Sequence, residues 1–295
     1  MQDFAGKVAV ITGAGSGFGR EFARLGAQLR MKLVLADVQQ DALEQVATEL
    51  RAAGAEVLAE RVDVSQGDQV DTLAQRSSDA FGAVHLLFNN AGVAAGGLVW
   101  EHTTKDWDWV LGVNLWGVIH GVRAFAPRML AHGEEGHIVN TASVAGLLSP
   151  PLMGVYNVSK HAVVTLTETL YHDLRVANAK IGCSVLCPAF VPTGIHESQR
   201  NRPAALSENR APTASQIAAR RASEKAVTSG KISAATVAQM TFDAIRERRF
   251  YVITHPKILP SVELRLQDIV NQRNPSDPFS FKPEVSAKLG EEPPV

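Results

Sequence analysis

Hydrophobic residues along the chain form short runs separated by stretches with helical spacing. Apolar, largely β-branched runs cover residues 7–12, 32–37, 56–62, 84–88, 137–141, 181–187 and 250–254. Such runs, bounded by polar or glycine-rich segments, predict strands that are buried on both faces. Between them, apolar residues recur at helical spacing, which predicts amphipathic helices. This alternation indicates an α/β fold with one doubly wound parallel sheet of about seven strands and helices on both faces.

The length and charge of the chain favour one large domain without a nucleic-acid partner. Its 295 residues can bury a substantial core, and its 29 basic residues nearly balance 30 acidic ones. It has no dense run of lysine and arginine, so the electrostatic signature of a nucleic-acid-binding protein is missing. It also has no leader-like segment and no apolar run of membrane-spanning length. A soluble, cytoplasmic protein without a membrane partner is therefore expected.

The first strand ends in a glycine-rich loop that leads into a predicted helix over residues 21–31. Glycines permit a tight turn and close backbone approach, and a helix N-terminus offers unpaired N–H groups to a phosphate. The strict GxGxxG fingerprint is absent, because Phe18 and Arg20 stand where its third glycine is needed. An ordinary flexible turn is therefore the alternative to a dinucleotide-binding loop. The candidate phosphate-binding residues are Gly13, Ser16, Gly17, Phe18 and Gly19.

An acidic residue, Asp37, ends the second strand at about the distance expected for a ribose-binding carboxylate. It can accept both adenosine-ribose hydroxyls and would repel a 2′-phosphate. Neither Val38 nor Ser16 brings a cation to offset that repulsion. Strand, loop, helix and acid together indicate a Rossmann-like sheet that binds NAD in preference to NADP. The competing interpretation is that Asp37 caps the helix that follows.

Polar residues follow two further strands, and another polar residue lies in an apolar stretch with helical spacing. Asn90 follows the fourth strand and Ser143 follows the fifth, so both would face the ligand crevice at the carboxyl edge of the sheet. Each is equally suited to be an ordinary turn residue. Asn114 lies within residues 104–130, which read as one or two helices. A buried amide there needs hydrogen-bond partners and can serve structure alone.

Tyr156 and Lys160 open a long stretch with helical spacing. Residues four apart share a helix face, so the Lys160 ammonium would lie near the Tyr156 phenol and favour its ionised form. That would make the tyrosine a usable base. The pair alone is weak evidence, since a half-buried ring beside a solvated lysine is common at this spacing.

The chain has only two cysteines, Cys183 and Cys187, which lie in one strand. An extended strand separates them by roughly 13 Å, so they cannot form a disulfide with each other. Without CxxC spacing or clustered histidines, no metal site is expected.

Residues 194–230 interrupt the alternation of strands and helices. They are rich in Arg, Ala, Ser, Asn and Pro and show no deep apolar period, which suits a mobile flap over a crevice. A helix capped by Ser233 and a last strand complete residues 1–255, the expected dinucleotide-binding catalytic domain. Residues 256–295 are an expected C-terminal extension, partly irregular, with one amphipathic run at 260–270.

In this order, the motifs resemble the short-chain dehydrogenase/reductase family over residues 7–254. The family's Asn-Asn-Ala-Gly motif is matched by residues 89–92, and its Thr-Gly-x-x-x-Gly-x-Gly loop is matched by Thr12, Gly13, Gly17 and Gly19. Its catalytic asparagine, serine, tyrosine and lysine fall on Asn114, Ser143, Tyr156 and Lys160. The resemblance implies an NAD-dependent oxidoreductase that transfers a hydride between the nicotinamide and a secondary alcohol or ketone.

The resemblance also implies roles for individual residues. Tyr156 would be the general acid or base, Lys160 would bind the nicotinamide ribose, and Ser143 would polarise the carbonyl. Asn114 would hold a water that connects the lysine to solvent. Further cofactor contacts are implied for Asp63 and Val64 at the adenine, for Val191 and Thr193 at the carboxamide, and for Asn90, Gly92 and Pro188.

The chain departs from the family where Ala189 follows Pro188 in place of the usual glycine. This change is expected to shift the loop that leads to the nicotinamide pocket and to retune substrate access. An apolar substrate pocket is expected from Leu147, Leu148, Pro150, Leu152, Met153 and Phe190, of which the first five can equally pack the loop onto its own core. A hydrophobic secondary alcohol or ketone is therefore the expected substrate, and a homodimer or homotetramer the expected assembly.

Two other functions stay under consideration. A catalytically silent dinucleotide-binding sensor or scaffold would be expected to lose Ser143, Tyr156 or Lys160, and this chain keeps all of them. An epimerase or dehydratase among the extended relatives would carry a Gly-x-x-Gly-x-x-Gly loop and a larger C-terminal substrate domain. This chain shows neither feature.

Overall fold

A single parallel sheet forms the centre of the structure, a computed structural model that describes residues 1–208 and 210–281. Its seven strands lie in the order β3-β2-β1-β4-β5-β6-β7, which confirms the predicted doubly wound α/β fold. The strands are β1 (Val8–Thr12), β2 (Lys32–Asp37), β3 (Val57–Arg61), β4 (Leu86–Asn89), β5 (Gly136–Thr141), β6 (Ile181–Cys187) and β7 (Tyr251–Ile253).

The strand order reverses between β1 and β4. Ile11 of β1 pairs with Leu35 of β2 on one side and with Phe88 of β4 on the other. The crossovers on the two sides of β1 therefore lead away from each other, and they leave a crevice beyond the carboxyl ends of these strands.

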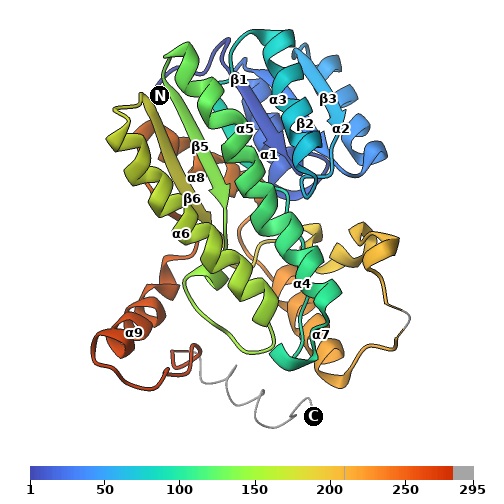
Figure 1. Ribbon diagram of the computed structural model, residues 1–295, viewed down its shortest axis with the longest axis vertical. Helices are drawn as coiled ribbons and strands as arrows, with labels where there is room; N and C mark the ends of the chain where they lie inside the picture. The colour runs from blue at the N-terminus through green and yellow to red at the C-terminus, as the bar shows by residue number, and fades with distance from the viewer. Residues whose placement is uncertain (209, 282–295) are drawn as a thin grey trace.

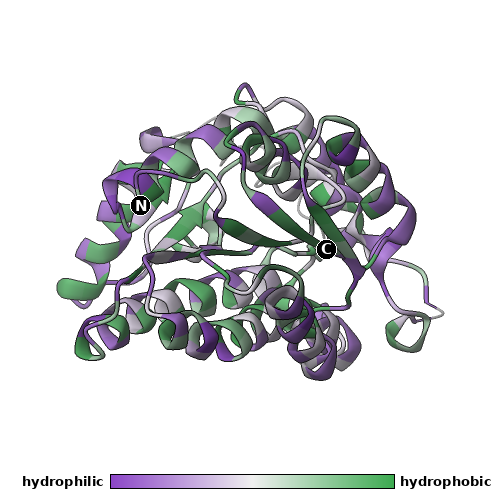
Figure 2. Cartoon of the chain, turned by 90° about the horizontal axis from the view of Figure 1, so that it is seen from above, coloured by the Kyte–Doolittle hydropathy of each residue, from purple (hydrophilic) through white to green (hydrophobic). Residues whose placement is uncertain are grey.

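Both faces of the sheet are covered by helices (Figure 1). Figure 2 shows the hydrophobic strands between the two helix layers. Alternate strand residues face opposite sides, so Ile11 packs with Phe22 in one core while Val10 packs with Phe125 in the other. Burial of each large side chain stabilises the fold by about 1.5–3 kcal/mol. The first core is covered by α1 (Gly17–Gln28), α2 (Gln40–Ala52) and α8 (Ala234–Glu247). The second is covered by α3 (Gly67–Phe81), α5 (Gly117–His132) and α6 (Gly154–Val176).

The stretch expected as one or two helices over residues 104–130 has three parts. Helix α4 (Thr104–Leu111) begins with a capping box, in which Thr103 and Asp106 bond each other's main-chain N–H groups. The π-helical turn η2 (Gly112–Trp116) then joins α4 directly to α5. Helix α5 ends at His132 and is followed by the C-cap residue Gly133, whose φ of 68° suits glycine.

Two helices begin earlier than the sequence pattern predicts. Helix α1 begins at Gly17, inside the glycine loop, instead of at residue 21. Helix α6 begins at Gly154, so Tyr156 lies within its first turn and does not open it. Apolar spacing does not mark these starts, because glycines occupy them.

The expected flap at residues 194–230 is largely helical where the structure describes it. It contains the 3-10 turns η4 (Gly194–Asn201) and η5 (Ala204–Leu206), followed by helix α7 (Ala214–Thr228), which starts with a capping box of Thr213 and Gln216. The sequence pattern does not predict α7, because few of its side chains are buried.

Beyond β7, the short turn η6 (Pro256–Ile258) leads into helix α9 (Leu259–Val270), at the predicted amphipathic run. Figure 1 shows α9 projecting from the end of the molecule below the sheet. Residues 282–295 of the expected C-terminal extension lie outside the described residues. Two further 3-10 turns, η1 (Val99–Glu101) and η3 (Val144–Gly146), follow β4 and β5.

Candidate active site

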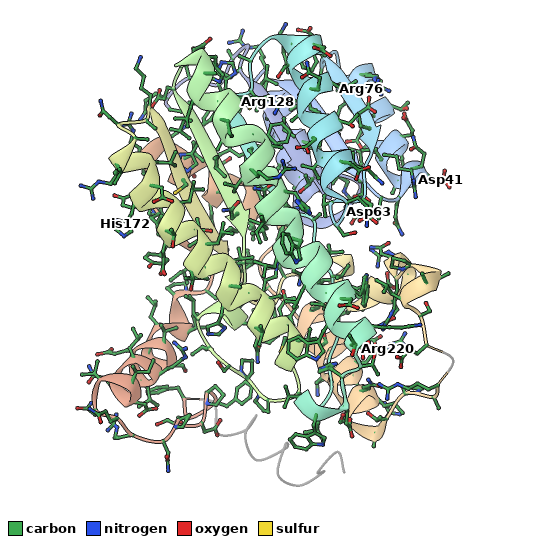
Figure 3. All side chains as sticks on the ribbon, viewed as in Figure 1. Asp41, Asp63, Arg76, Arg128, His172 and Arg220 are labelled. Carbon is green, nitrogen blue, oxygen red and sulfur yellow. The ribbon has the colours of Figure 1, made fainter. Side chains whose placement is uncertain are left out.

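A pocket lies at the carboxyl edge of the sheet, where the strand order reverses. Nearly all the residues predicted from the sequence line it. These are Gly13, Ser16, Gly17, Phe18, Asp37, Asp63, Val64, Asn90, Gly92, Ser143, Tyr156, Lys160, Pro188, Val191 and Thr193. Gly19 and Asn114 were predicted for the site but are not part of the pocket lining. Asp63, labelled in Figure 3, lies at the end of β3 that borders this pocket.

The glycine loop fits closely against the neighbouring strand end. A Cβ atom at Gly13, whose φ is 67°, would lie 2.9 Å from Ala91 Cα, and one at Gly19 would lie 2.0 Å from the Gly13 carbonyl oxygen. Larger residues at these positions would push the loop apart. The loop main chain thus lies open to the pocket, directly before the N-terminus of α1, as a bound phosphate requires. Gly19 supports the loop from behind, which explains why it does not line the pocket.

Asp37 is held by main-chain N–H groups on both sides. Its Oδ2 accepts from Gly15 N at 2.9 Å and its Oδ1 accepts from Gln39 N at 2.9 Å. The N-cap residue of α2 is Gln39, so the competing interpretation of Asp37 as that helix's cap is wrong. Each carboxylate oxygen keeps a lone pair for a hydroxyl group in the pocket.

Asn90 links the ends of three strands. Its main-chain N–H donates to Thr12 Oγ1 at 2.9 Å, and its side-chain Nδ2 donates to the Thr12 carbonyl at 3.0 Å. Its Oδ1 accepts from Thr141 Oγ1 at 3.4 Å. Asn90 therefore fixes β1, β4 and β5 at the pocket floor, which is more than an isolated turn residue does.

Ser143, Tyr156 and Lys160 meet on the β5 and α6 side of the pocket. Ser143 is buried, and its Oγ accepts from Ala145 N at 3.1 Å and donates to the Pro188 carbonyl at 3.4 Å. The Lys160 Nζ lies 5.6 Å from the centre of the Tyr156 ring and donates to the Thr141 carbonyl at 2.9 Å. A hydroxyl, a phenol and an ammonium group thus line one wall.

Burial is the main cause of the pKa shifts of Tyr156 and Lys160. It raises the pKa of Tyr156, and a hydrogen bond with Ser143 opposes part of that shift. It also lowers the pKa of Lys160 to about 8, because a buried ammonium loses its hydration. The predicted effect of Lys160 on the phenol does not dominate in the protein alone, since the ammonium lies at the ring and binds Thr141. In the protein alone, burial therefore opposes ionisation of the phenol.

Asn114 is fully buried in the π-helical turn. Its Oδ1 accepts from Val93 N at 2.8 Å, while its Nδ2 donates to the Val93 carbonyl at 2.9 Å and to Ser159 Oγ at 3.0 Å. Both amide hydrogens are therefore used within the protein. The amide anchors Val93, the residue after Gly92 of the pocket wall, and π-helical turns are frequent at such functional positions.

The apolar end of the pocket differs from the predicted one. The predicted residues Leu147, Leu148, Pro150, Leu152, Met153 and Phe190 are not part of its lining. Leu147 packs against the core between α6 and β6, and Phe190 is 45 % exposed. The apolar side chains present there are Val93, Trp109, Val113, Ile195, Leu206 and Val227. Val93 follows β4, Trp109 lies in α4 and Val113 lies in η2, whereas Ile195, Leu206 and Val227 belong to residues 194–230. The positions of these segments relative to one another depend on contacts distant in sequence.

Several other lining residues were also missed. Val38, Gln39 and Val62 adjoin predicted residues, and that adjacency is the signal that could have identified them. Asp108, Ser198, Arg200 and Asn201 carry no local motif.

Residues 194–230 are tied to the body of the protein by polar contacts. Asn201 Oδ1 accepts from Gln39 Nε2 at 2.6 Å, and Ser198 Oγ accepts from Ala94 N at 3.0 Å. At the α4 end, Arg202 donates to the buried Asp106 at 2.6 Å. Glu101 accepts from Thr213 at 2.7 Å. The segment thus spans the pocket from the β2 side to the α4 side.

This fold and pocket define the class of a dinucleotide-binding α/β oxidoreductase. A family model described as short chain dehydrogenase matches residues 7–204. The chain belongs to the short-chain dehydrogenase/reductase family and is an enzyme of the oxidoreductase type.

Similar proteins cover nearly the whole chain. A crystal structure of a short chain dehydrogenase/reductase from Burkholderia phymatum in complex with NAD is 65 % identical, has a TM-score of 0.94, and covers 95 % of this chain and 100 % of its own. A CLA biosynthesis dehydrogenase/reductase of Lactiplantibacillus plantarum is 36 % identical over 93 % of this chain and 97 % of that protein. A C alpha-dehydrogenase of Sphingobium sp. strain SYK-6 is 32 % identical over 98 % of this chain and 94 % of that protein.

Within the described ranges 1–208 and 210–281, no helix is sufficiently long and apolar to cross a membrane.

Proposed function

We propose that this chain is an NAD-dependent dehydrogenase/reductase that acts on a hydrophobic secondary alcohol or the corresponding ketone. The observation that carries this proposal is the wall formed by Ser143, Tyr156 and Lys160 in the same pocket as the glycine loop and Asp37. In this proposal, residues 1–255 form the catalytic domain, and residues 194–230 act as a flap over its crevice.

The residues present fit NAD. The main chain of the glycine loop would hold the diphosphate, Asp37 the adenosine ribose, and Lys160 the nicotinamide ribose. Asp37 disfavours the 2′-phosphate of NADP. The nearby cation Arg61 does not compensate, since its Nε donates to the Val38 carbonyl at 3.2 Å and the residue does not line the pocket. Bound NAD supplies the hydride acceptor.

The proton is handled by the protein's own side chains. Tyr156 takes the proton of the alcohol oxygen in oxidation and returns it in reduction. Ser143 holds that oxygen and stabilises negative charge that develops on it. Lys160 would favour the phenolate against the cost of burial, which raises the pKa of Tyr156, and bound oxidised NAD would supply further positive charge. Asn114 serves by fixing Val93, and any water at this turn would bind to groups other than its amide hydrogens.

The substrate class follows from the apolar end of the pocket. Val93, Trp109, Leu206 and Val227 are apolar residues that line the same pocket as Tyr156, and the acidic residues in the described lining are Asp37, Asp63 and Asp108. A substrate with an apolar, ring-sized body next to its carbinol carbon suits such a wall, because it removes apolar surface from water without leaving polar groups unpaired.

We also propose that the chain forms a homodimer or homotetramer. Leu115, Val122, Leu166 and Leu170 line a shallow hollow between α5 and α6, and Trp116 beside it is 52 % exposed. Such a patch on two adjacent helices suits a second copy of the chain.

An NAD-linked screen tests the function. Purified protein is incubated with NAD or NADP and with aliphatic, aromatic, steroid and sugar alcohols, and reduced cofactor is followed at its absorbance band. We expect NADH with aryl or cyclic secondary alcohols and little NADPH. Net turnover with sugar nucleotides alone, or no turnover with any alcohol despite NAD binding, would contradict the proposal.

A further inference from the structure

We infer that Arg200, on the flap, binds the cofactor diphosphate from the side opposite the glycine loop. This inference rests on the proposed NAD-dependent function and adds to it a charged contact from the flap.

The pocket carries few positive charges for a ligand with two phosphate groups. Among the described lining residues the acidic ones are Asp37, Asp63 and Asp108, and the basic ones are Lys160 and Arg200. Lys160 is buried against Thr141, on the wall with Tyr156, and is therefore placed at the proposed reaction centre and not at the diphosphate. The N-terminus of α1 contributes only about half a charge. Arg200 is the remaining full positive charge in this lining.

Arg200 lies close to the place where the glycine loop would seat phosphate. A Cβ atom at Gly17 would lie 3.4 Å from Thr193 Cβ and Cγ2, so the residue that precedes the flap touches the start of α1. A Cβ atom at the next residue, Gly194, would lie 2.9 Å from one terminal nitrogen of Arg200. The guanidinium group is thus within one residue of the contact between the flap and the phosphate loop.

The flap holds the guanidinium in place and leaves donors free for a ligand. Arg200 Nη1 donates to the Gly194 carbonyl at 2.8 Å, and its ion pair with the exposed Glu197 is long at 3.6 Å. A guanidinium group has five N–H donors in a planar fork that suits phosphate oxygens. The neighbouring Asn201 is bonded to Gln39 beyond Asp37, so η4 passes from the phosphate loop to the ribose-binding loop. A diphosphate between these loops would lie next to Arg200.

Binding of NADH and of ADP-ribose, followed by fluorescence or calorimetric titration, tests the inference. Charge-assisted contacts to phosphate are among the strongest hydrogen bonds, so Arg200→Ala should raise both dissociation constants about tenfold. Arg200→Lys should recover part of that loss, because it restores the charge. The loss in Arg200→Ala should shrink as salt is raised, because salt screens partly exposed charges. The matched control is Arg220→Ala, which removes an exposed arginine of α7 in the same flap, labelled in Figure 3, and should leave both constants unchanged.

The outcomes separate this inference from the proposed function. Wild-type binding of NADH together with unchanged affinity in Arg200→Ala would overturn the role of Arg200 and leave the function standing. Equal losses in Arg200→Ala and Arg220→Ala, or a salt-independent loss that lysine does not recover, would also overturn it, because they indicate a general charge effect or a structural one. If the wild type bound neither NADH nor ADP-ribose, the function and the inference would fall together.

Discussion

The two edges of the sheet carry similar polar side chains and use them differently. At the amino edge, His85 accepts from Val8 N at 3.1 Å through Nδ1 and lies 3.0 Å from Glu134 through Nε2, while Lys7 donates to Glu134 at 2.6 Å. Hydrogen bonds from Lys7 and His85 lower the pKa of Glu134 to about 2. At this edge, polar groups satisfy one another.

At the carboxyl edge, Tyr156 and Lys160 have no carboxylate partner of this kind. Tyr156 and Lys160 have shifted pKa values because of burial, and neither has a carboxylate among the causes of its shift. Both residues line the pocket. One set of strands thus carries a stabilising amino edge and a reactive carboxyl edge. Substitutions at the amino edge should change stability, and substitutions at the carboxyl edge should change activity.

Tyr156→Phe is expected to give the largest difference between the effect on turnover and the effect on stability. Loss of a positioned acid or base costs about 10²–10⁴-fold in turnover, whereas the lost phenol hydroxyl should change the free energy of unfolding by less than about 1 kcal/mol. Steady-state kinetics and urea denaturation measure the two effects. In the wild type, alcohol oxidation should accelerate as pH rises, because the phenolate is the base and burial raises the pKa of Tyr156. Near wild-type turnover in the variant would refute the role of the tyrosine.

The opposite pattern is expected for His85→Leu at the amino edge. It leaves the buried Val8 N–H without its acceptor, which should lower the free energy of unfolding by about 1–3 kcal/mol. The turnover of the folded enzyme should stay within about twofold, because His85 is remote from the pocket. Chemical denaturation and kinetics on the same sample test this. If His85→Leu left stability unchanged and reduced activity, the distinction between a stabilising amino edge and a reactive carboxyl edge would be wrong.

A smaller effect, confined to the cofactor, is expected for Asp37→Asn. The amide oxygen can still accept from Gly15 N, while the charge that repels a 2′-phosphate disappears. The preference for NADH over NADPH, measured as the ratio of kcat/KM values, should narrow by about tenfold, or 1.4 kcal/mol. Comparable use of the two cofactors by the wild type would remove the basis for this role of Asp37.

The smallest effect is expected for Ala189→Gly. The described non-glycine residues with positive φ do not include Ala189, so alanine fits the loop without backbone strain. The glycine variant should therefore change kcat/KM by less than about twofold. A larger change would support the earlier expectation that alanine retunes substrate access.

The strands and the reactive wall could be predicted because their signals are local. Buried parallel strands are short apolar runs, the glycine loop directly follows the first of them, and Tyr156 and Lys160 lie one helical turn apart. Ser143 needs only the position of a strand end. These features depend on few contacts from other parts of the chain.

The apolar end of the pocket could not be predicted, because distant contacts determine it. Leu206 reaches Trp109 and Val93 through a flap held by the Asp106–Arg202 pair, whose members are nearly a hundred positions apart. No local pattern indicates such a pair. The loop at Leu147 offered a more apolar sequence, and its side chain packs into the core instead.

The π-helical turn Gly112–Trp116 has a consequence for insertions and deletions. Each residue of an α-helix turns the chain by about 100°, so deleting one residue there would rotate α4 by that angle relative to α5. Trp109 would leave the pocket and Asp106 would leave Arg202, although α5 could still pack on the sheet. Changes in chain length that are neutral in surface loops should therefore be rejected at this turn during evolution.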